Sequence, residues 1–253
     1  MALFLTVRLM QRMRIDIYLT ESGIASSRTE AKRFITEGAV HVDGKVVLKP
    51  SFDVSGLEGC VSVDKTNFKY VSRGGIKLEE AIKSFNINCQ DKLCLDIGAS
   101  SGGFTDCLLQ NGAKHVIAVD AGRAQLVDKI SSDARVTSIE NYNARYIAKD
   151  DLGYLPSLAV MDVSFISATY IIEPLYDCLD EGADFICLIK PQFEVGRDGL
   201  GKGGIVKDDK VRKRAVDRVV SFAESKGYKF LELIQSPIKG GDGNIEFLAH
   251  FKK

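Results

Sequence analysis

The sequence predicts an α/β fold, in which a small α+β unit precedes a mainly parallel sheet covered by helices on both faces. From about residue 73 onward, apolar runs of strand length alternate with helical patterns, which is typical of a parallel sheet. A glycine-rich turn follows the first of these runs. The part of the chain before residue 73 has two short helical patterns and then a hairpin. At 253 residues the chain is long enough for one large domain or two unequal ones.

The composition limits the classes of function. Lys plus Arg and Asp plus Glu both number 34, so any surface that binds nucleic acid has to be a local patch. The six cysteines form no Cys-x-x-Cys pair and the three histidines are not spaced to share a metal with them, so we predict reduced cysteines and no metal site. The apolar opening is too short for a membrane span and lacks a signal-peptide pattern, and Met13 is an alternative start. We therefore expect a cytoplasmic protein that binds no membrane and has no evident obligate protein partner.

The first predicted domain covers residues 13–66, after a tail at residues 1–12. Its hairpin is centred on Asp43-Gly44, because alternating apolar residues flank this dipeptide. Gly38 ends the second helical pattern, in keeping with the preference for glycine after a helix. The expected elements are helices at Met13–Ser22 and Arg28–Glu37 and, after the hairpin, short strands at Phe52–Val54 and Cys60–Val63.

A linker at residues 67–72 leads to the second predicted domain, at residues 73–253. Seven strand-like runs with helical patterns between most of them predict a sheet that is buried on both faces. The expected strands are Leu93–Ile97, His115–Val119, Val136–Ile139, Leu158–Met161, Phe185–Ile189, Phe230–Ile234 and Ile245–Phe251, and the main helices are residues 76–87, 103–111, 168–179 and 207–226.

The turn after the first of these strands has an acidic residue ahead of its glycines. Glycine lets a ligand approach the backbone closely, although many strand-to-helix turns need glycine for packing alone. The order Asp96-x-Gly98 favours S-adenosylmethionine, whose methionine part offers a polar end to a carboxylate, over a dinucleotide. Asp120 ends the next strand at the spacing of a ribose-binding carboxylate, and a strand-end cap is the alternative interpretation. The predicted cofactor residues are Asp96, Gly98, Ser100, Gly102, Gly103, Phe104 and Asp120, with Asn141 and Asn143 at the adenine.

Four charged residues, Lys77, Asp162, Lys190 and Glu246, stand at the edges of distinct short patterns, and three of them end or interrupt apolar runs. A charge in such a place has to be paired or used, because burying an unpaired ion is costly. A ribose hydroxyl loses its proton as it attacks an activated methyl group, so methyl transfer needs alignment and proton removal. We expect Lys190 to take or stabilise that proton, Asp162 to orient Lys190, and Glu246 to hold Lys77. An ordinary network of buried ion pairs is the alternative.

Basic residues in both domains are candidates for RNA contacts. Several lie near one face of the second predicted helix, where a solvated helix surface is the alternative interpretation. The segment Gly196–Val206 fits part of a phosphate-loop template but has Gly203 where Ser or Thr has to bind magnesium, so we interpret it as a flap over RNA. The predicted RNA contacts are Arg28, Lys32, Arg33, Lys45, Arg73, Arg197 and Lys202.

These residues carry two family resemblances. From Ser27 to Gly44 the chain follows Ser-Arg-x-x-Ala-Lys-x-x-Ile-x-x-Gly-x-Val-x-Val-Asp-Gly, which resembles the S4 RNA-binding module. Residues 72–251 resemble the FtsJ-type ribose 2′-O-methyltransferases, and both parts together resemble the haemolysin-A-like (TlyA-type) rRNA methyltransferases. One departure is Asp162-Val-Ser-Phe, where simple FtsJ proteins have Asp-Met-Ala-Pro, and another is Gly74-Gly75, where related chains often have Ala and a larger residue.

The resemblance implies a Rossmann-like, seven-stranded, S-adenosylmethionine-dependent methyltransferase domain behind an S4 domain. It implies that the Lys-Asp-Lys-Glu set named above is catalytic and that the acceptors are 2′-hydroxyls of cytidines in ribosomal RNA, free or in ribosomal subunits. Three other functions stay open. They are a non-catalytic RNA-binding or ribosome-assembly factor, a membrane-active haemolysin, and a methyltransferase for small molecules, in which the RNA module would have no role.

Overall fold

The computed structural model describes residues 12–25, 27–65, 68–196 and 199–253. These residues divide into two compact units, the first ending at Phe68 and the second beginning at Lys69. The two units are described separately below.

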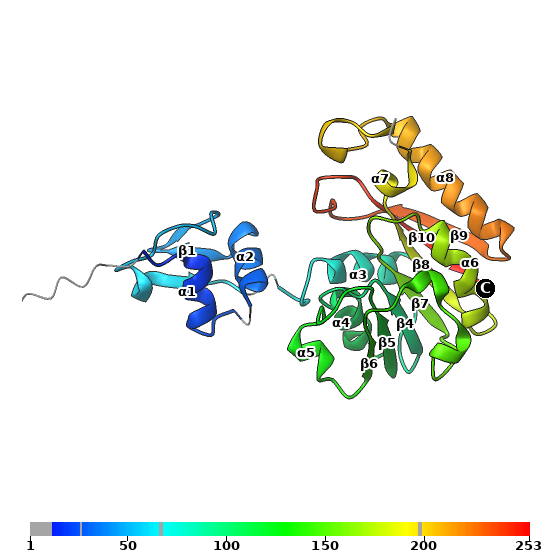
Figure 1. Cartoon of the computed structure of the whole chain (residues 1–253), viewed down its shortest axis with the longest axis horizontal. Coiled ribbons are helices and arrows are strands. Elements are labelled where there is room, and N and C mark those ends of the chain that lie inside the picture. Colours follow the sequence, from blue (N-terminus) through cyan, green and yellow to red (C-terminus); the bar gives the residue numbers. More distant parts are fainter. Residues whose placement is uncertain (1–11, 26, 66–67, 197–198) are drawn as a thin grey trace, which may run out of the picture. The chain divides into compact units, whose positions relative to one another are not determined.

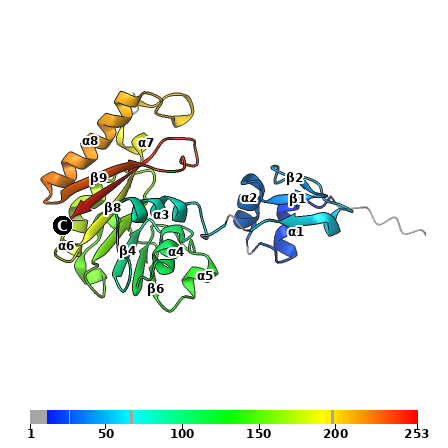
Figure 2. The same cartoon turned by 180° about the vertical axis from the view of Figure 1, so that it is seen from behind.

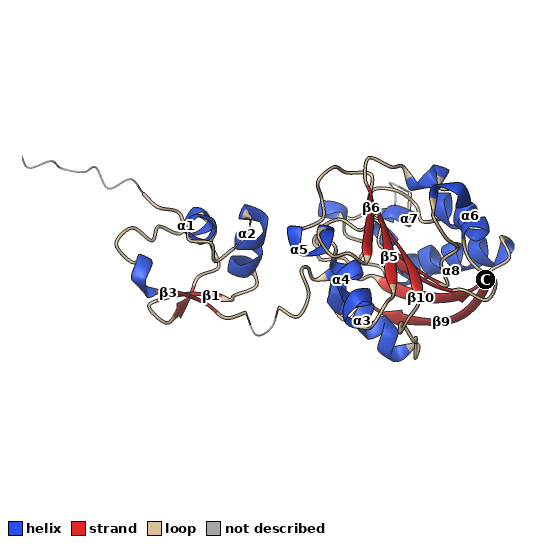
Figure 3. Ribbon diagram, turned by 90° about the horizontal axis from the view of Figure 1, so that it is seen from below, coloured by secondary structure: helices blue, strands red, loops and turns tan. Residues whose placement is uncertain are grey.

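The first unit is a three-stranded antiparallel sheet with two helices. The strand order is β2-β1-β3, and α1 and α2 lie on the same side of β1 and β3 in Figure 3. Ser27 begins α2 as its cap, because its side chain accepts a hydrogen bond from the Glu30 amide at 3.2 Å. The elements are α1 (Ile15–Glu21), α2 (Arg28–Thr36), β1 (Val40–Val42), β2 (Lys45–Val46), the short 3-10 helix η1 (Glu58–Cys60) and β3 (Val61–Val63).

The strand predicted at Phe52–Val54 is wrong, because this segment forms only an isolated bridge between Asp53 and Arg14. The Val54 amide bonds to Met13 O and the Ile15 amide to Phe52 O, so pairing begins between the two segments. It cannot continue, since Ile15 is already the first residue of α1.

The second unit contains a seven-stranded sheet of order β6-β5-β4-β7-β8-β10-β9. The five strands from β6 to β8 are parallel, and β10 is antiparallel to both of its neighbours. This confirms the predicted α/β class and the direct connection of the last two strands. The strands are β4 (Leu93–Ile97), β5 (His115–Val119), β6 (Val136–Ile139), β7 (Leu158–Met161), β8 (Asp184–Ile189), β9 (Lys229–Gln235) and β10 (Phe247–Lys252).

The helices cover both faces of this sheet. Figures 1 and 2 show α3, α4 and α5 on one face and α6 and α8 on the other. Two hydrophobic clusters account for the layers, one containing Leu78 and Leu108 and the other containing Leu175 and Val219. The main helices are α3 (Gly74–Ser84), α4 (Gly103–Gln110), α5 (Asp128–Ser131), α6 (Thr169–Cys178), α7 (Pro191–Glu194) and α8 (Asp209–Ser225), and the short 3-10 helices are η2 (Ala144–Tyr146), η3 (Lys149–Asp151) and η5 (Lys202–Gly204).

Several element boundaries in the second unit differ from the predicted ones by one to three residues, and the starts of the last strand and of α3 are two examples. The last strand begins at Phe247 rather than Ile245, because Asn244 bonds to the segment before α8, with Oδ1 accepting from the Val206 amide at 2.9 Å. Helix α3 begins at Gly74 rather than at residue 76. Figures 1 and 2 both show the loop between β9 and β10 beside the segment that leads into α8.

Strand direction fixes where the functional segments meet. The carboxyl ends of β4, β5, β7 and β8 lie at one edge of the sheet because these strands are parallel. Strand β10 starts at the same edge because it runs in the opposite direction. The glycine-rich turn and the residues that follow β5, β7 and β8 are therefore gathered at this edge with the residue that precedes β10.

Two glycines allow the segment before α3 to pack closely against the starts of α3 and α4. A Cβ on Gly75 would lie 2.2 Å from Cγ of Tyr70, and a Cβ on Gly103 would lie 2.0 Å from Oγ of Ser72. Neither distance is possible for a real side chain. The Tyr70 ring is itself buried and forms part of the cluster under α3.

We predict that Gly75→Ala destabilises the second unit by about 1–3 kcal/mol, because an overpacked side chain has to displace the Tyr70 ring. Urea unfolding measures the change in the free energy of unfolding. Gly153→Ala is the matched control, because nothing lies within 4 Å of its Cβ position. Equal stability of the two variants would contradict the packing role of Gly75.

Candidate active site

Asp96, the fourth residue of β4, is fully buried beside the glycine-rich turn. One carboxylate oxygen accepts a hydrogen bond from Thr105 Oγ1 at 2.6 Å, and the other, Oδ1, has no hydrogen-bond partner. Burial raises the pKa of Asp96 to about 7, although the Thr105 bond acts in the opposite direction. An unpartnered carboxylate oxygen at this position is suited to a cationic or N–H group of a ligand.

The conformation of the turn that follows β4 is set by its glycine backbone and by backbone amides that bond to Asp120. Gly98 has φ +83° and lies so close to the end of β7 that an added Cβ would meet Asp162 O at 2.3 Å. The Ser100 amide donates to Asp120 Oδ2 at 2.8 Å, and the Gly122 amide donates to Oδ1 of the same carboxylate at 2.7 Å. Asp120 therefore stabilises two loops, as a residue with a purely structural role would. Its carboxylate still has lone pairs that can accept hydrogen bonds from ribose hydroxyls.

The predicted cofactor residues Gly102, Gly103 and Phe104 surround the start of α4. Gly102 has φ +93°, a left-handed conformation that glycine adopts without strain. The Phe104 side chain is 3% exposed and packs in the core, so the side chain itself cannot contact a ligand. What Phe104 can offer to a ligand is its backbone amide in the first turn of the helix.

Asn141 and Asn143 follow β6 and are both exposed. The backbone of Asn141 is left-handed, with φ +53°, and its amide donates to Gly122 O at 2.8 Å. The side chain of Asn143 caps η2 by accepting a hydrogen bond from the Arg145 amide at 3.1 Å. Asn143 thus has a local structural partner, whereas Asn141 lies beside the loop that follows Asp120.

The four charged residues form two ion pairs. Lys77 Nζ lies 2.5 Å from Glu246 Oε2, and both side chains are less than a tenth exposed. Lys190 Nζ lies 2.5 Å from Asp162 Oδ1 and donates a hydrogen bond to Ser164 Oγ at 2.8 Å. Gly240 allows the loop before β10 to close over the first pair, since a Cβ there would lie 2.4 Å from Glu246 Oε1.

Sheet register places the two pairs next to each other. Phe247 of β10 is paired with Ile189 of β8, so the adjacent residues Glu246 and Lys190 lie on neighbouring strands at the same edge. Asp162 follows β7, which is hydrogen-bonded to both β8 and β4. The two ammonium groups and two carboxylates therefore converge beside the turn that contains Gly98.

Sequence analysis missed two exposed neighbours of Lys190. Ser164 accepts its hydrogen bond, as described above. Phe165 is 90% exposed and has φ +63°, a conformation that is unfavourable for a bulky residue. Its ring lies 5.2 Å from that of Phe193 in α7. The available signal was the departure from Asp-Met-Ala-Pro, because an aromatic residue directly after a buried strand end needs an explanation.

In the first unit, two of the predicted RNA contacts have structural partners. Arg28 and Arg14 both donate hydrogen bonds to the fully buried Asp16. Burial acts to raise the pKa of Asp16, but these bonds outweigh it and hold the pKa below its usual value. Arg33 lies 3.6 Å from Glu37 and stacks on the Phe68 ring at 4.7 Å. The side chains of the other two predicted contacts, Lys32 and Lys45, are exposed.

In the second unit, Arg73 and Lys202 are exposed, and Arg197 lies outside the described residues. Arg73 immediately precedes α3. Lys77 lies in the same helix, three residues after its first residue. Lys202 begins η5 in the segment interpreted as a flap. The end of that segment is tied to the loop before β10, because Asn244 Nδ2 donates to Gly204 O at 3.1 Å.

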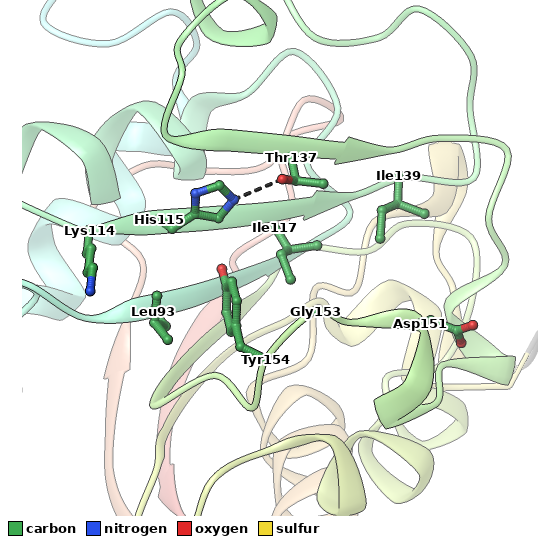
Figure 4. Close-up of a pocket in the computed structure, with 9 residues that line it drawn as sticks. All are labelled: Leu93, Lys114, His115, Ile117, Thr137, Ile139, Asp151, Gly153 and Tyr154. Carbon is green, nitrogen blue, oxygen red and sulfur yellow. Dashed lines mark hydrogen bonds between the residues drawn. The ribbon is translucent and has the colours of Figure 1, made fainter.

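A separate cavity of about 400 Å³ lies against β4, β5 and β6 and shares no residue with the predicted cofactor or charged sets. Figure 4 shows His115 and Thr137 hydrogen-bonded across two strands on one side, with Tyr154 facing them.

Over the described ranges, no cluster of three His, Cys, Asp or Glu residues is placed to bind a metal ion. All six cysteines are free, and Cys60 is the exposed one. None of the described helices is both long and apolar enough to cross a membrane.

Two protein-family models match different parts of the chain. The S4 domain model matches residues 13–64, and the FtsJ-like methyltransferase model matches residues 70–253. The chain belongs to the FtsJ-like methyltransferase family. The fold and the turn described above are those of its methyltransferase domain.

Several relatives share both parts of the chain. "Hemolysin A" of Brachyspira hyodysenteriae is 45% identical over 94% of this chain and 99% of its own length. "16S/23S rRNA (cytidine-2'-O)-methyltransferase TlyA" of Mycobacterium tuberculosis is 39% identical over 94% of this chain and 88% of its own. A solved structure, "Putative hemolysin from Streptococcus thermophilus", has a TM-score of 0.77 at 43% identity and covers 96% of this chain and 89% of that one.

We predict that the buried carboxyl of Asp96 makes the free protein less stable as pH rises from 3.8 to about 7. The folded chain holds this proton more tightly than the unfolded chain, so the free energy of unfolding falls across this range, by up to about 4 kcal/mol at ~1.4 kcal/mol per pKa unit. Urea unfolding of the wild type and Asp96→Asn at several pH values measures the difference. A difference that does not change with pH would contradict a protonated Asp96.

Proposed function

We propose that this family member transfers the methyl group of S-adenosylmethionine to ribose 2′-hydroxyls of cytidines in ribosomal RNA, which places it in the cytoplasm. The proposal is supported most directly by the two ion pairs beside the glycine-rich turn, of which Lys77–Glu246 is buried and Lys190–Asp162 is partly buried. The naming of the Mycobacterium tuberculosis relative as a cytidine-2′-O-methyltransferase supports the acceptor.

The residues at the turn fit the methyl donor. Asp96 Oδ1 lacks a partner and suits the amino group of the methionine part, and Asp120 at the end of β5 suits ribose hydroxyls. Gly98 and Gly102 give the turn its left-handed backbone, with φ of +83° and +93°, and Asn141, which follows β6, is the residue proposed at the adenine. The bound donor supplies a methyl group on a sulfonium, which is already activated for transfer.

Lys190 is assigned the proton transfer. The Lys190 ammonium first releases one proton to water, and the neutral amine at Nζ then takes the proton of the acceptor hydroxyl as the new O–CH₃ bond forms and the S–CH₃ bond breaks. Asp162 and Ser164 hold the Lys190 side chain and stabilise the ammonium that results. Lys77, fixed by Glu246, adds positive charge next to the reacting oxygen, where negative charge develops.

The remaining assignments concern RNA binding. Exposed Lys32 and Lys45 in the first unit, and Arg73 and Lys202 in the second, are proposed to contact phosphates. Arg28 shares its charge with Asp16, and Arg33 stacks on Phe68, so we propose that both act mainly by shaping the surface of the first unit. Arg197 stays a sequence-based prediction.

We predict that Lys190→Ala lowers the rate of methyl transfer by about 10²–10⁴-fold, the usual contribution of a general base, while the affinity for S-adenosylmethionine stays nearly constant. Transfer of tritiated methyl groups to ribosomal subunits measures the rate, and calorimetry measures the affinity. Lys92→Ala is the matched control, since Lys92 pairs with Asp184 at 2.7 Å at the opposite edge of the sheet. Normal turnover of Lys190→Ala would refute the assignment, and an inactive wild type would favour a non-catalytic RNA-binding or assembly factor.

We predict that Phe165→Ala weakens RNA binding or turnover by about 5–150-fold, the equivalent of one base stacked on an aromatic ring at ~1–3 kcal/mol. The exposed, strained position of the ring beside Lys190 suits the base of the acceptor nucleotide. Steady-state kinetics with Phe165→Tyr as the conservative variant tests this, because tyrosine keeps the stacking face. Equal kinetics of Phe165→Ala and the wild type would exclude the stacking role.

A further inference from the structure

Two segments lie side by side at the edge of the sheet where β7 and β8 end, which is called the catalytic edge below. They carry different residues of the proposed active site. Residues 162–168 contain Asp162, Ser164 and Phe165, and residues 190–194 contain Lys190 followed by α7. Three sets of contacts join them. Lys190 meets Asp162 and Ser164 at one end, and Phe165 meets Phe193 in the middle.

Glu194 makes the third set of contacts, at the other end. Its side chain is buried at 4% exposure. Oε2 accepts a hydrogen bond from Ser167 Oγ at 2.6 Å, and Oε1 accepts one from the Ala168 amide at 2.7 Å. The donors are neutral groups, and burial accordingly raises the pKa of Glu194 despite the two bonds.

These bonds also cap α6 from outside the helix. The residue before α6, Ala168, has no side-chain group to cap it, and α6 begins at Thr169. The Ser167 side chain accepts a hydrogen bond from the Thr169 amide at 3.3 Å, and the Glu194 carboxylate adds a second acceptor, for the Ala168 amide, that interacts favourably with the helix dipole. Ser167 Oγ extends the network to Thr169 Oγ1 at 2.7 Å. The orientation of the segment that follows β7 is therefore set by a side chain from the segment that follows β8.

We propose that Glu194 is a positioning residue for methyl transfer, which fixes residues 162–168 against α7 and so sets Asp162, Ser164 and Phe165 around Lys190. Glu194 acts through these residues and does not itself contact the reacting atoms. The proposal rests on the function proposed above. It goes beyond that function because it assigns alignment to a residue outside the four charged ones.

The position of Glu194 explains why alignment and cofactor binding should separate. The residues assigned to the cofactor lie in β4 or follow β4, β5 and β6, whereas Glu194 holds the segments that follow β7 and β8. Loss of Glu194 should therefore impair the acceptor side and leave the donor side intact. A displacement of about 1 Å in such a site lowers the rate by up to ~100-fold.

The test compares Glu194→Ala with Glu194→Gln in methyl transfer to ribosomal subunits. A glutamine can accept from the Ala168 amide with its oxygen and donate to Ser167 Oγ with its nitrogen, so it retains the shape of the network without the charge. We expect Glu194→Ala to lower kcat by about 10- to 100-fold and Glu194→Gln to recover most of it. We also expect the Kd for S-adenosylmethionine to change less than about twofold in both variants, because the donor residues lie on other strands.

Two further variants make the test decisive. Ser167→Ala keeps the carboxylate but removes the bond to Glu194 and the bonds of Ser167 Oγ to Thr169, so it should lower kcat by at least about fivefold, the equivalent of one hydrogen bond. Glu173→Ala is the control on α6, because it removes only a surface ion pair between Glu173 and Lys226 at 2.6 Å. We expect wild-type kcat for this variant.

The outcomes separate the two proposals. Wild-type kcat in Glu194→Ala, or equal losses in Glu194→Ala and Glu194→Gln, would overturn the positioning role while an active wild type leaves the proposed function in place. A fall in cofactor affinity that matches the fall in kcat would also overturn it, because the effect would then be general destabilisation. An inactive wild type would instead contradict the proposed function itself.

Discussion

The pairing of four charges at one edge of the sheet is the constraint on which the site depends. Lys77, Asp162, Lys190 and Glu246 are partly or wholly buried, and an unpaired ion in any of these places would destabilise the fold. Pairing is possible because the parallel strands end where the antiparallel strand β10 begins. The register of β8 and β10 therefore places Lys190 beside Glu246, and Lys77 joins them from α3.

The sides proposed for the cofactor and for the acceptor have different physical characters. The cofactor side is built from backbone, with glycines of positive φ and amides that bond to Asp120. The acceptor side is built from side chains that are held by other side chains, as Lys190 is by Asp162 and Ser164. Phe165 is exposed on the side proposed for the acceptor, as the proposed entry and exit of a nucleotide requires.

Buried carboxylates play several roles in this chain, and their partners distinguish them. Asp16 receives two arginines and organises the surface of the first unit. Glu194 receives two neutral donors and connects two segments at the catalytic edge. Asp96 keeps one oxygen without a partner, which is the arrangement expected of a group that waits for a ligand.

The sequence by itself determined the order of the elements and the identity of the four charged residues, because strand periodicity and charges at strand ends are local signals. It also placed the glycine-rich turn correctly after β4. It predicted a strand at Phe52–Val54 that is only a bridge, since strand formation depends on how far the partner segment stays extended.

Only the tertiary structure decided which charges pair and what lies around them. The contact between Lys77 and Glu246 joins residues 169 positions apart, and no local pattern specifies such a pairing. The structural role of Asn143, the core position of Phe104 and the cap that Glu194 provides for α6 also follow from packing. Hydrogen bonding and close packing act between elements that are far apart in the sequence. These contacts are therefore decided only when the elements come together in the fold, and local sequence patterns do not reveal them.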